Sequence, residues 1–355
     1  MKKLSVCVLF GGMSPEHEVS LRSAESVLNQ LDKQKYNLFP VGITKRGDWI
    51  LYGGEDYSAL PGGVWETCPE NRRAAISPVR GQGLLSFEGD CVVREHIDVV
   101  FPVLHGEHGE DGTVQGLLRL AGLPFVGPDV AASAVCMDKT LTKLVADHAG
   151  IRQAAWELVN ASALRGDCTR LLERLEARFA YPMFVKPAGT GSSVGVSKAL
   201  DRAALERALR DAAKFDKKVL VEEFIDGQEV EVAVLGNDAP AASVCGEIVA
   251  GADFYDYEAK YISDCAKLVI PARLDETVSE RVRDTAIRAY RALGCRGLSR
   301  VDFFVTRKDR EVVFNEINTI PGFTSISMYP KLFEASGIPY PELLDRLIEL
   351  AMEEA

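Results

Sequence analysis

The chain has 355 residues, of which 47% are hydrophobic, enough to fill more than one core, so we expect a multi-domain globular protein. The formal net charge of −11 argues against a nucleic-acid or anionic-membrane surface, because such surfaces gather lysine and arginine. The eight cysteines include no Cys-x-x-Cys pair, which argues against a zinc ribbon or a disulfide scaffold and indicates reduced thiols in the cytoplasm.

The opening segment MKKLSVCVLF is interpreted as a first β-strand. It has the charge and the apolar run of a short signal peptide, but glycine, proline and charged residues follow it at once. No run of the sequence approaches the roughly 20 apolar residues that span a bilayer. We therefore expect a cytoplasmic protein with neither a membrane nor a nucleic-acid partner.

The first 128 residues are expected to form an α/β unit with a mostly parallel sheet, because apolar runs and helical periodicity alternate. The expected strands are Leu4–Phe10, Leu38–Ile43, Val99–Leu104 and Pro124–Val126, and the expected helices are Leu21–Leu31 and Thr113–Ala121. Residues 47–95 are richer in Gly, Pro and charge, and we expect short strands and loops there.

Two further units are expected, over residues 129–221 and 222–355. The second unit should contain a long helix, a strand, a glycine- and serine-rich loop and a charged helix. Its expected elements are Asp129–Ala149, Pro182–Lys186, Val194–Ser197 and Arg202–Phe215. The third unit should open with a strand and contain two helices and a hairpin. Its expected elements are Val219–Ile225, Glu276–Leu293, Leu298–Ile317 and Pro341–Met352.

Four polar side chains are expected to converge on the hairpin within GLSRVDFFVTRKDREVVFNEINTIPG. If its turn is centred near Asp309, then Asp302 faces Glu316 and Arg300 faces Asn318, and residues two apart share a strand face. Two carboxylates and an amide oxygen are ligands that Mg²⁺ prefers when it also holds nucleotide phosphates. The arginine would complement a phosphoryl group. For the hairpin alone, a solvent-facing strand remains the alternative.

A loop of small residues, PAGTGSSVG, follows Lys186 at the end of an apolar strand. Such a loop lets backbone N–H groups and hydroxyls approach a phosphate. Its spacing matches neither a Walker motif nor the dinucleotide fingerprint, and an ordinary surface loop remains the alternative. Lys139 in MDKTLTK is a second candidate phosphate cation, although a lone helical lysine is commonly solvated.

The segment VLVEEFIDGQEVEVAV offers a place for adenosine. Phe224 and Ile225 are apolar enough to line an adenine slot, and the carboxylates of Glu222 and Glu229 are candidate partners for ribose hydroxyls. Two adjacent exposed strands would give the same pattern.

In their order along the chain, these motifs resemble the D-alanine–D-alanine ligase family of ATP-grasp enzymes over essentially the whole length. The matching segments are GGMSPEHEVS, FPVLHGEHGEDGTVQG, MDKTLTK, FVKPAGTGSSVGVSK, FYDYEAKY and RVDFFVTRKDREVVFNEINTIPGFTSISMYP. The resemblance implies a three-domain ATP-grasp fold (1–128, 129–221, 222–355), with ATP between the central and C-terminal domains. Phe224 departs from the tryptophan that many members carry.

The resemblance also assigns roles to individual residues. It places a hydrogen-bonded triad at Glu16, Ser192 and Tyr261, and it places His105 near the first D-alanine. Arg300 would support the intermediate, and Gly322, Ser327 and Met328 would surround the second substrate. ATP contacts would fall on Lys139, Lys186, Glu222, Glu223, Phe224, Ile225 and Glu229. Two Mg²⁺ ions, for which Mn²⁺ can substitute, would bind Asp302, Glu316 and Asn318.

The implied activity is ATP-dependent joining of two D-alanine molecules through D-alanyl phosphate, for peptidoglycan precursor synthesis by a cytoplasmic homodimer. Tyr261 and the apolar Met328 fit a methyl side chain. One methyl gives only about 1–3 kcal/mol of discrimination, so D-serine or D-lactate stays open as second substrate. A non-catalytic ATP sensor is a weaker alternative, as is a zinc site at His105, His108 and Glu110, which lacks a fourth ligand.

Overall fold

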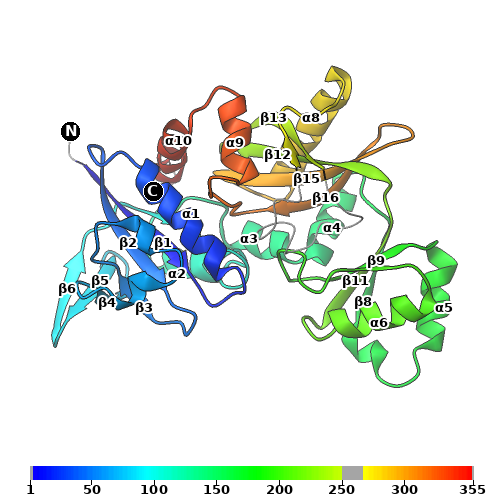
Figure 1. Ribbon diagram of the computed structural model, residues 1–355, viewed down its shortest axis with the longest axis horizontal. Coiled ribbons are helices and arrows are strands. Elements are labelled where there is room, and N and C mark those ends of the chain that lie inside the picture. Colours follow the sequence, from blue (N-terminus) through cyan, green and yellow to red (C-terminus); the bar gives the residue numbers. More distant parts are fainter. Residues whose placement is uncertain (1–2, 250–266, 354–355) are drawn as a thin grey trace.

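The computed structural model describes residues 3–249 and 267–353, which form three β-sheets (Figure 1). The first sheet has seven strands in the order β6-β5-β4-β3-β2-β1-β7. These are β1 (Leu4–Gly11), β2 (Tyr36–Ile43), β3 (Trp49–Leu51), β4 (Arg72–Ile76), β5 (Leu84–Glu88), β6 (Cys91–Glu95) and β7 (Val99–Pro102). Strand β1 pairs in parallel with β2 and β7, and the other neighbours pair antiparallel. The predicted parallel sheet is therefore confirmed at its centre, and residues 47–95 extend it with antiparallel strands.

Helices cover both faces of the parallel centre. Val8 of β1 packs with Leu28 of helix α1, while its neighbour Leu9 points to the opposite face and packs with Leu118 of helix α2. This burial on both faces explains why β1 is a continuous apolar run. The helices are α1 (His17–Gln30) and α2 (Thr113–Ala121), and the 3₁₀ helices η1 (Tyr57–Ala59) and η2 (Val64–Thr67) lie between β3 and β4. The strand predicted over 124–126 is reduced to a bridge between Val100 and Phe125.

The second sheet is antiparallel, with four strands in the order β10-β9-β11-β8, and it lies at the lower right of Figure 1. Its strands are β8 (Trp156–Asn160), β9 (Met183–Pro187), β10 (Ser197–Ala199) and β11 (Lys218–Glu223), and its helices are η3 (Ala161–Leu164), α5 (Thr169–Arg178) and α6 (Arg202–Ala212). It has a core of its own, in which Leu175 of α5 and Leu209 of α6 pack with Val219. Strand β11 thus belongs to this sheet, and the expectation that it opens the third unit is wrong.

The third sheet has five strands in the order β14-β13-β12-β15-β16, all paired antiparallel. They are β12 (Gly227–Leu235), β13 (Ala241–Val249), β14 (Lys267–Val269), β15 (Leu298–Thr306) and β16 (Val312–Asn318), with helices α8 (Glu276–Ala292), α9 (Met328–Ala335) and α10 (Tyr340–Met352). Helix α8 packs on one face through Val282, and α9 packs on the other through Leu332. The leucine face of α10 packs in the same core as α9, and α1 contributes to that core too.

The long helix predicted over 129–149 is wrong, because the chain breaks at Asp138 into α3 (Val130–Met137) and α4 (Lys139–His148). Asp138 is extended, with φ −85° and ψ 100°, and its carboxylate accepts hydrogen bonds from the backbone N–H groups of Thr140 and Leu141. A capping side chain satisfies the free N–H groups of a new helix and so competes with continuation of the old one. The break aims the start of α4, with Lys139, at the region between the second and third sheets.

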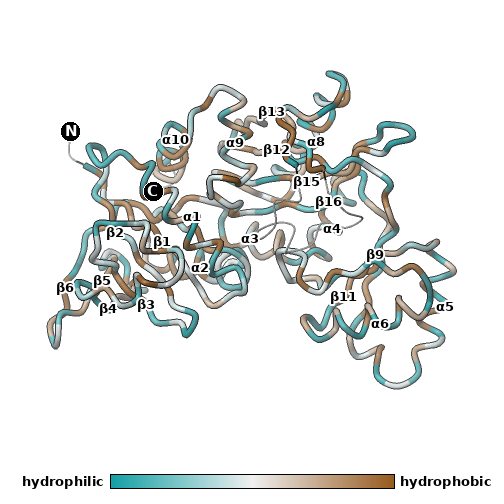
Figure 2. Tube along the Cα trace, viewed as in Figure 1, coloured by the Kyte–Doolittle hydropathy of each residue, from teal (hydrophilic) through white to brown (hydrophobic). Residues whose placement is uncertain are grey.

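The three sheets follow one another along the chain, but their packing is shared. Ala132 of α3 and Ala146 of α4 lie in the core under the third sheet. Figure 2 shows hydrophobic residues along strands such as β12 and β13, and hydrophilic ones in the loops around α5 and α6. Within residues 3–249 and 267–353, no helix is both long and apolar enough to cross a bilayer.

Candidate functional site

The β15–β16 hairpin brings the four predicted polar residues together. Its register pairs Asp302 with Glu316 and Arg300 with Asn318, as predicted, although the register shifts between Asp302 and Phe303, on the side toward the turn. The Nδ2 atom of Asn318 donates a hydrogen bond to Oδ2 of Asp302 at 3.1 Å. Asp302 is only 8% exposed, so this hairpin face lines an interior site, and the alternative of a solvated strand is wrong.

Arg300 is held by two carboxylates on neighbouring strands. Its guanidinium donates to both oxygens of Asp302, at 2.8 and 2.7 Å, and its Nε lies 3.1 Å from Oε2 of Glu231 on β12. Glu231 pairs in register with Asp302, so Glu231, Asp302 and Glu316 stand side by side on three strands. The sequence analysis missed Glu231, although its alternation with Glu229 along β12 signals a carboxylate on the same face.

The donor chemistry of this cluster fits Mg²⁺. Asp302, Glu316 and Asn318 supply carboxylate and amide oxygens from adjoining strands, which are hard ligands suited to that ion. Among the described residues, no three His, Cys, Asp or Glu side chains are grouped for a metal, so the set depends on the amide as its third member.

Two predicted lysines approach the same region from α4 and β9. Lys139 donates to the carbonyl of Thr190 at 2.6 Å, and its Nζ lies 3.8 Å from Oε2 of Glu316. Lys186 donates to Oδ1 of Asn315 at 3.2 Å and lies 2.6 Å from Oε2 of Glu222. Cations from the second sheet and from α4 therefore face carboxylates on the third sheet.

Glu222 is a buried counter-ion for two lysines. Besides Lys186, it pairs with Lys143 of α4, whose Nζ lies 2.5 Å from Oε1. Burial alone would raise the pKa of Glu222, but the two ammonium groups outweigh it and lower this pKa to about 2. For Lys186, burial lowers the pKa, and the charges of Glu222 and Glu316 more than compensate, so its pKa is raised. Sequence reasoning missed Lys143, which stands in the quoted motif MDKTLTK.

A pair of stacked aromatic rings lies beside these charges. Phe224 is 40% exposed and stacks on Phe184 of β9, with ring centroids 6.2 Å apart. The Nζ of Lys198 on β10 lies 4.9 Å from the centre of the Phe224 ring. The sequence predicted Phe224 but missed Phe184, which alternates with Lys186 on β9 and so shares its strand face.

Glu223 is another residue predicted to contact adenosine. Its side chain bonds to the backbone before β8, where its Oε1 accepts a hydrogen bond from the N–H of Ala155 at 2.8 Å. Ile225 and Glu229 are half-buried at the start of the third sheet. Their contacts with a nucleotide stay a prediction.

Glu16 joins the first sheet to the glycine- and serine-rich loop. The Ser192 hydroxyl donates a hydrogen bond to Oε1 of Glu16, as two members of the predicted triad require. The backbone closes around this carboxylate, since a Cβ at Gly106 or at Gly191 would lie 2.6 or 2.9 Å from Oε2. Ser192 has a φ of +49°, which turns the loop into the left-handed region that non-glycine residues rarely adopt. Tyr261, the third member, lies outside the described residues.

His105 has a partner at each of its two ring nitrogens. Nδ1 lies 3.0 Å from the carbonyl of Ile320, which can only accept, so Nδ1 carries the hydrogen. Nε2 then accepts from the Ser23 hydroxyl at 3.2 Å, and burial lowers the pKa of the ring. With both nitrogens used in this way, His105 orients the loop that follows β16 rather than binding zinc.

Glu110 was considered only as a zinc ligand. Like His105, it links the loop that follows β7 to the loop that follows β16. Its carboxylate accepts from the N–H groups of Gly106 at 2.8 Å and Ile320 at 3.1 Å. Burial and the nearby charge of Glu16 raise its pKa from the ordinary 4.5 to about 8, against the effect of these hydrogen bonds.

We expect this half-buried carboxyl to make stability depend on pH. Because the folded protein holds the proton more tightly than the unfolded chain, whose carboxyl titrates near 4.5, Glu110 costs increasing stability as the pH rises from about 5 to about 8. The thermal unfolding midpoint of the wild type, relative to that of Glu110→Gln, should therefore decrease as the pH is raised from 5.5 to 8.5. Glu107→Gln, at an exposed position of the same loop, should show no such trend. A wild-type advantage that grew with pH would contradict the assignment.

The predicted residues around a second substrate lie at the start of α9. Gly322 packs closely on Ser327, since a Cβ at position 322 would lie 2.7 Å from the Ser327 Oγ. The Ser327 Oγ accepts a hydrogen bond from the N–H of Thr324 at 3.0 Å. Met328 is 5% exposed and packs against Gly246 of β13, so its side chain belongs to the core under α9.

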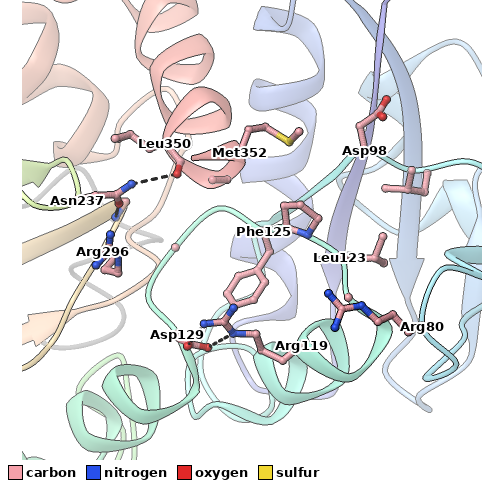
Figure 3. Close-up of a pocket in the computed structure, with 16 residues that line it drawn as sticks. Arg80, Asp98, Arg119, Leu123, Phe125, Asp129, Asn237, Arg296, Leu350 and Met352 are labelled. Atoms are coloured by element: carbon pink, nitrogen blue, oxygen red, sulfur yellow. Dashed lines mark hydrogen bonds and ion pairs between the residues drawn. The ribbon is translucent and has the colours of Figure 1, made fainter. Parts of the chain in front are cut away.

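A pocket of about 370 Å³ lies away from this cluster, between the first sheet and the end of α10 (Figure 3). Arg119 and Asp129 form an ion pair on its wall, and Asn237 donates to the carbonyl of Leu350 at 3.0 Å. None of the predicted site residues lines it, so we assign the site to the cluster above.

Comparison with known proteins gives consistent matches over the whole chain. Family models described as D-ala D-ala ligase N-terminus and C-terminus match residues 5–128 and 145–349. A D-alanine--D-alanine ligase of Acetivibrio thermocellus is 49% identical, covering 99% of this chain and 96% of the relative. The solved VanG D-Ala:D-Ser ligase from Enterococcus faecalis matches with a TM-score of 0.89 and 39% identity, over 99% and 100% of the two chains. The D-alanine-D-alanine ligase from Coxiella burnetii matches at 0.87 and 38%, over 100% and 95%.

Proposed function

This chain belongs to the D-alanine–D-alanine ligase family, and from that premise we propose that it uses ATP to join two D-alanine molecules. The products would be D-alanyl-D-alanine, ADP and phosphate. The observation that carries the proposal is the meeting of the Arg300–Asp302–Glu316–Asn318 hairpin with Lys139 and Lys186. The three-domain ATP-grasp fold of this chain brings the second and third sheets together at this point.

Activation of the first D-alanine is the first step. An amine does not displace oxide from a carboxylate, so one carboxylate oxygen must first become part of a phosphate leaving group. That oxygen attacks the γ-phosphorus of ATP, the bond to the β-phosphate oxygen breaks, and ADP leaves. Lys139 and Lys186 would hold the phosphates, and Arg300 would face the charge that builds on the transferring group. Bound Mg²⁺ supplies further neutralisation of that charge.

Formation of the peptide bond follows. The amine of the second D-alanine attacks the carbonyl carbon of D-alanyl phosphate, the C–O bond to phosphate breaks, and phosphate leaves with the oxygen that it gained and with the proton that the amine loses. Glu16 would hold the ammonium of the first D-alanine, with His105 packed nearby. Gly322 and Ser327 would receive the second carboxylate. The Ser192 hydrogen bond to Glu16 closes the loop over this point and would keep water from the intermediate.

Product analysis tests the proposal. We expect ADP release with D-alanine and not with L-alanine, and a D-alanyl-D-alanine mass among the products. Incubation with D-alanine plus D-serine or D-lactate shows which compound is preferred as second substrate. We expect D-alanine to be preferred. A product formed only with D-serine or D-lactate would contradict that preference, and ATP binding without any product would favour a sensor.

Several finer properties belong to the same proposal. We infer two Mg²⁺ ions at Asp302, Glu316 and Asn318, replaceable by Mn²⁺, and a homodimer that works in the cytoplasm, without a nucleic-acid or membrane partner, on peptidoglycan precursors. We also propose three domains, close to the division 1–128, 129–221 and 222–355 expected from the sequence. The run of β11 to Glu223 argues for a second boundary slightly later.

Glu231 offers a test of how Arg300 is aimed. Glu231→Gln should lower kcat by about tenfold, because loss of one charged partner lets the guanidinium leave its position, a cost typical of a charge-assisted hydrogen bond. The KM for ATP should change little. Glu247→Gln is the matched control, since this strand glutamate pairs with Arg273 instead. Equal loss in both variants would show a general effect of the sheet.

A further inference from the structure

Lys143 carries a charge in an almost fully buried position. Its side chain is 3% exposed, and its Nζ lies 2.5 Å from Oε1 of Glu222. A buried ammonium is costly unless it is paired, so this contact with Glu222 is what makes a lysine acceptable there. The residue stands one helical turn after Lys139 on α4, on the same side of the helix.

The other oxygen of Glu222 is taken by Lys186, at 2.6 Å. One carboxylate is therefore shared by two ammonium groups, one at each oxygen. Lys186 is the more exposed of the two, at 14%, and it also reaches Asn315, next to Glu316 on β16. Of the two lysines, Lys186 is the one with a contact to the hairpin, and Lys143 is the more deeply buried.

The charges of this trio explain why two lysines are needed. Lys186 and Glu222 alone would make a neutral pair, and a phosphate approaching a neutral pair gains little. Lys143 brings the trio to a net charge of +1. In a protein site with a low effective dielectric, that one charge changes the attraction for a nearby phosphate strongly.

We propose that Lys143 is a positioning residue of the ATP site, which balances Glu222 so that Lys186 stays available to a nucleotide phosphate. The inference rests on the proposed function, in which Lys186 binds ATP. A merely structural Lys143 would instead fasten α4 to β11 and leave the attraction for phosphate unchanged.

The test uses Lys143→Met and the double variant Lys143→Met/Glu222→Gln in the full chain. The single variant should raise the KM for ATP at least about tenfold, the order expected when one unit charge is lost near a phosphate. Its kcat at saturating ATP should fall by less. The double variant removes both charges, so Lys186 alone restores a net charge of +1 and affinity should recover most of the loss. Lys214→Met, at an exposed position, is the control.

Direct binding of the ATP analogue AMP-PNP with Mg²⁺, measured by calorimetry, separates this inference from the proposed function. It does not require D-alanine to be the substrate. Affinity within twofold of the wild type in Lys143→Met, or weaker binding in the double variant than in the single one, would overturn the inference. Should the single variant fail to fold, tenfold weaker binding by the double variant than by the wild type would also overturn it. A wild type that binds AMP-PNP but makes no dipeptide would contradict only the proposed function.

Discussion

Glu316→Gln is expected to reduce dipeptide formation by at least about a thousandfold, because the interactions lost act on the transition state of phosphoryl transfer. Glu316 faces Asp302 across β15 and β16 and lies 3.8 Å from the Lys139 ammonium. Glutamine keeps the shape of the side chain but removes the negative charge that a divalent ion needs. Steady-state ADP release measures the loss. Binding of Mn²⁺ in the presence of AMP-PNP, followed by electron paramagnetic resonance, should weaken in parallel.

Asp309→Asn is the matched control for that prediction, since it makes the same chemical change at the exposed turn of the same hairpin. It should leave both activity and Mn²⁺ binding close to wild type. Near-normal activity in Glu316→Gln would refute the metal assignment. Unfolding midpoints of both variants show whether any loss comes from the fold.

Glu16→Gln is expected to raise the KM for the first D-alanine by about tenfold to a hundredfold, the range for a lost hydrogen bond to a charged group. The carboxylate is enclosed by Gly106 and Gly191 and accepts from Ser192, so the amide would keep the packing but lose the attraction for an ammonium. Initial rates over a range of D-alanine concentrations at saturating ATP measure the effect, and the KM for ATP should stay within about threefold.

Glu18→Gln is the comparison for Glu16, because Glu18 lies in the first turn of α1, two residues after Glu16 at its N-cap, but is 49% exposed and pairs with Lys45. It should behave like the wild type. An unchanged KM for D-alanine in Glu16→Gln would remove Glu16 from the substrate site. A higher KM for both D-alanine and ATP would instead indicate a general loosening of the loop that carries Ser192.

The hairpin could be predicted because its determinants are local. A polar turn and a period of two predict the pairing of Asp302 with Glu316, which the structure has, but the register also shifts between Asp302 and Phe303, and the sequence pattern does not predict that shift. The break at Asp138 is local too, but it was missed because helical periodicity continues across it while a capping aspartate decides the outcome. The sheet to which β11 belongs depends on its pairing with β8 and β9, which no local pattern specifies.

The residues that the sequence analysis missed are those whose role comes from distant partners. Lys143 is one lysine among several until β11 brings Glu222 to it. Glu110 has significance only because Ile320, from the far end of the chain, donates to it. Glu231 was missed for a related reason. It contacts Arg300 only because β15, which carries Arg300, pairs with β12. Periodicity identifies a face, but tertiary pairing decides what that face meets.

The most direct test of the central claim follows oxygen from D-alanine whose carboxylate carries ¹⁸O. Because the account has a carboxylate oxygen attack the γ-phosphorus and later leave with the phosphate, mass analysis should find one labelled oxygen in each phosphate released, together with D-alanyl-D-alanine. Unlabelled phosphate would mean that water attacks ATP and that no acyl phosphate forms, which would contradict the account even if ADP were released.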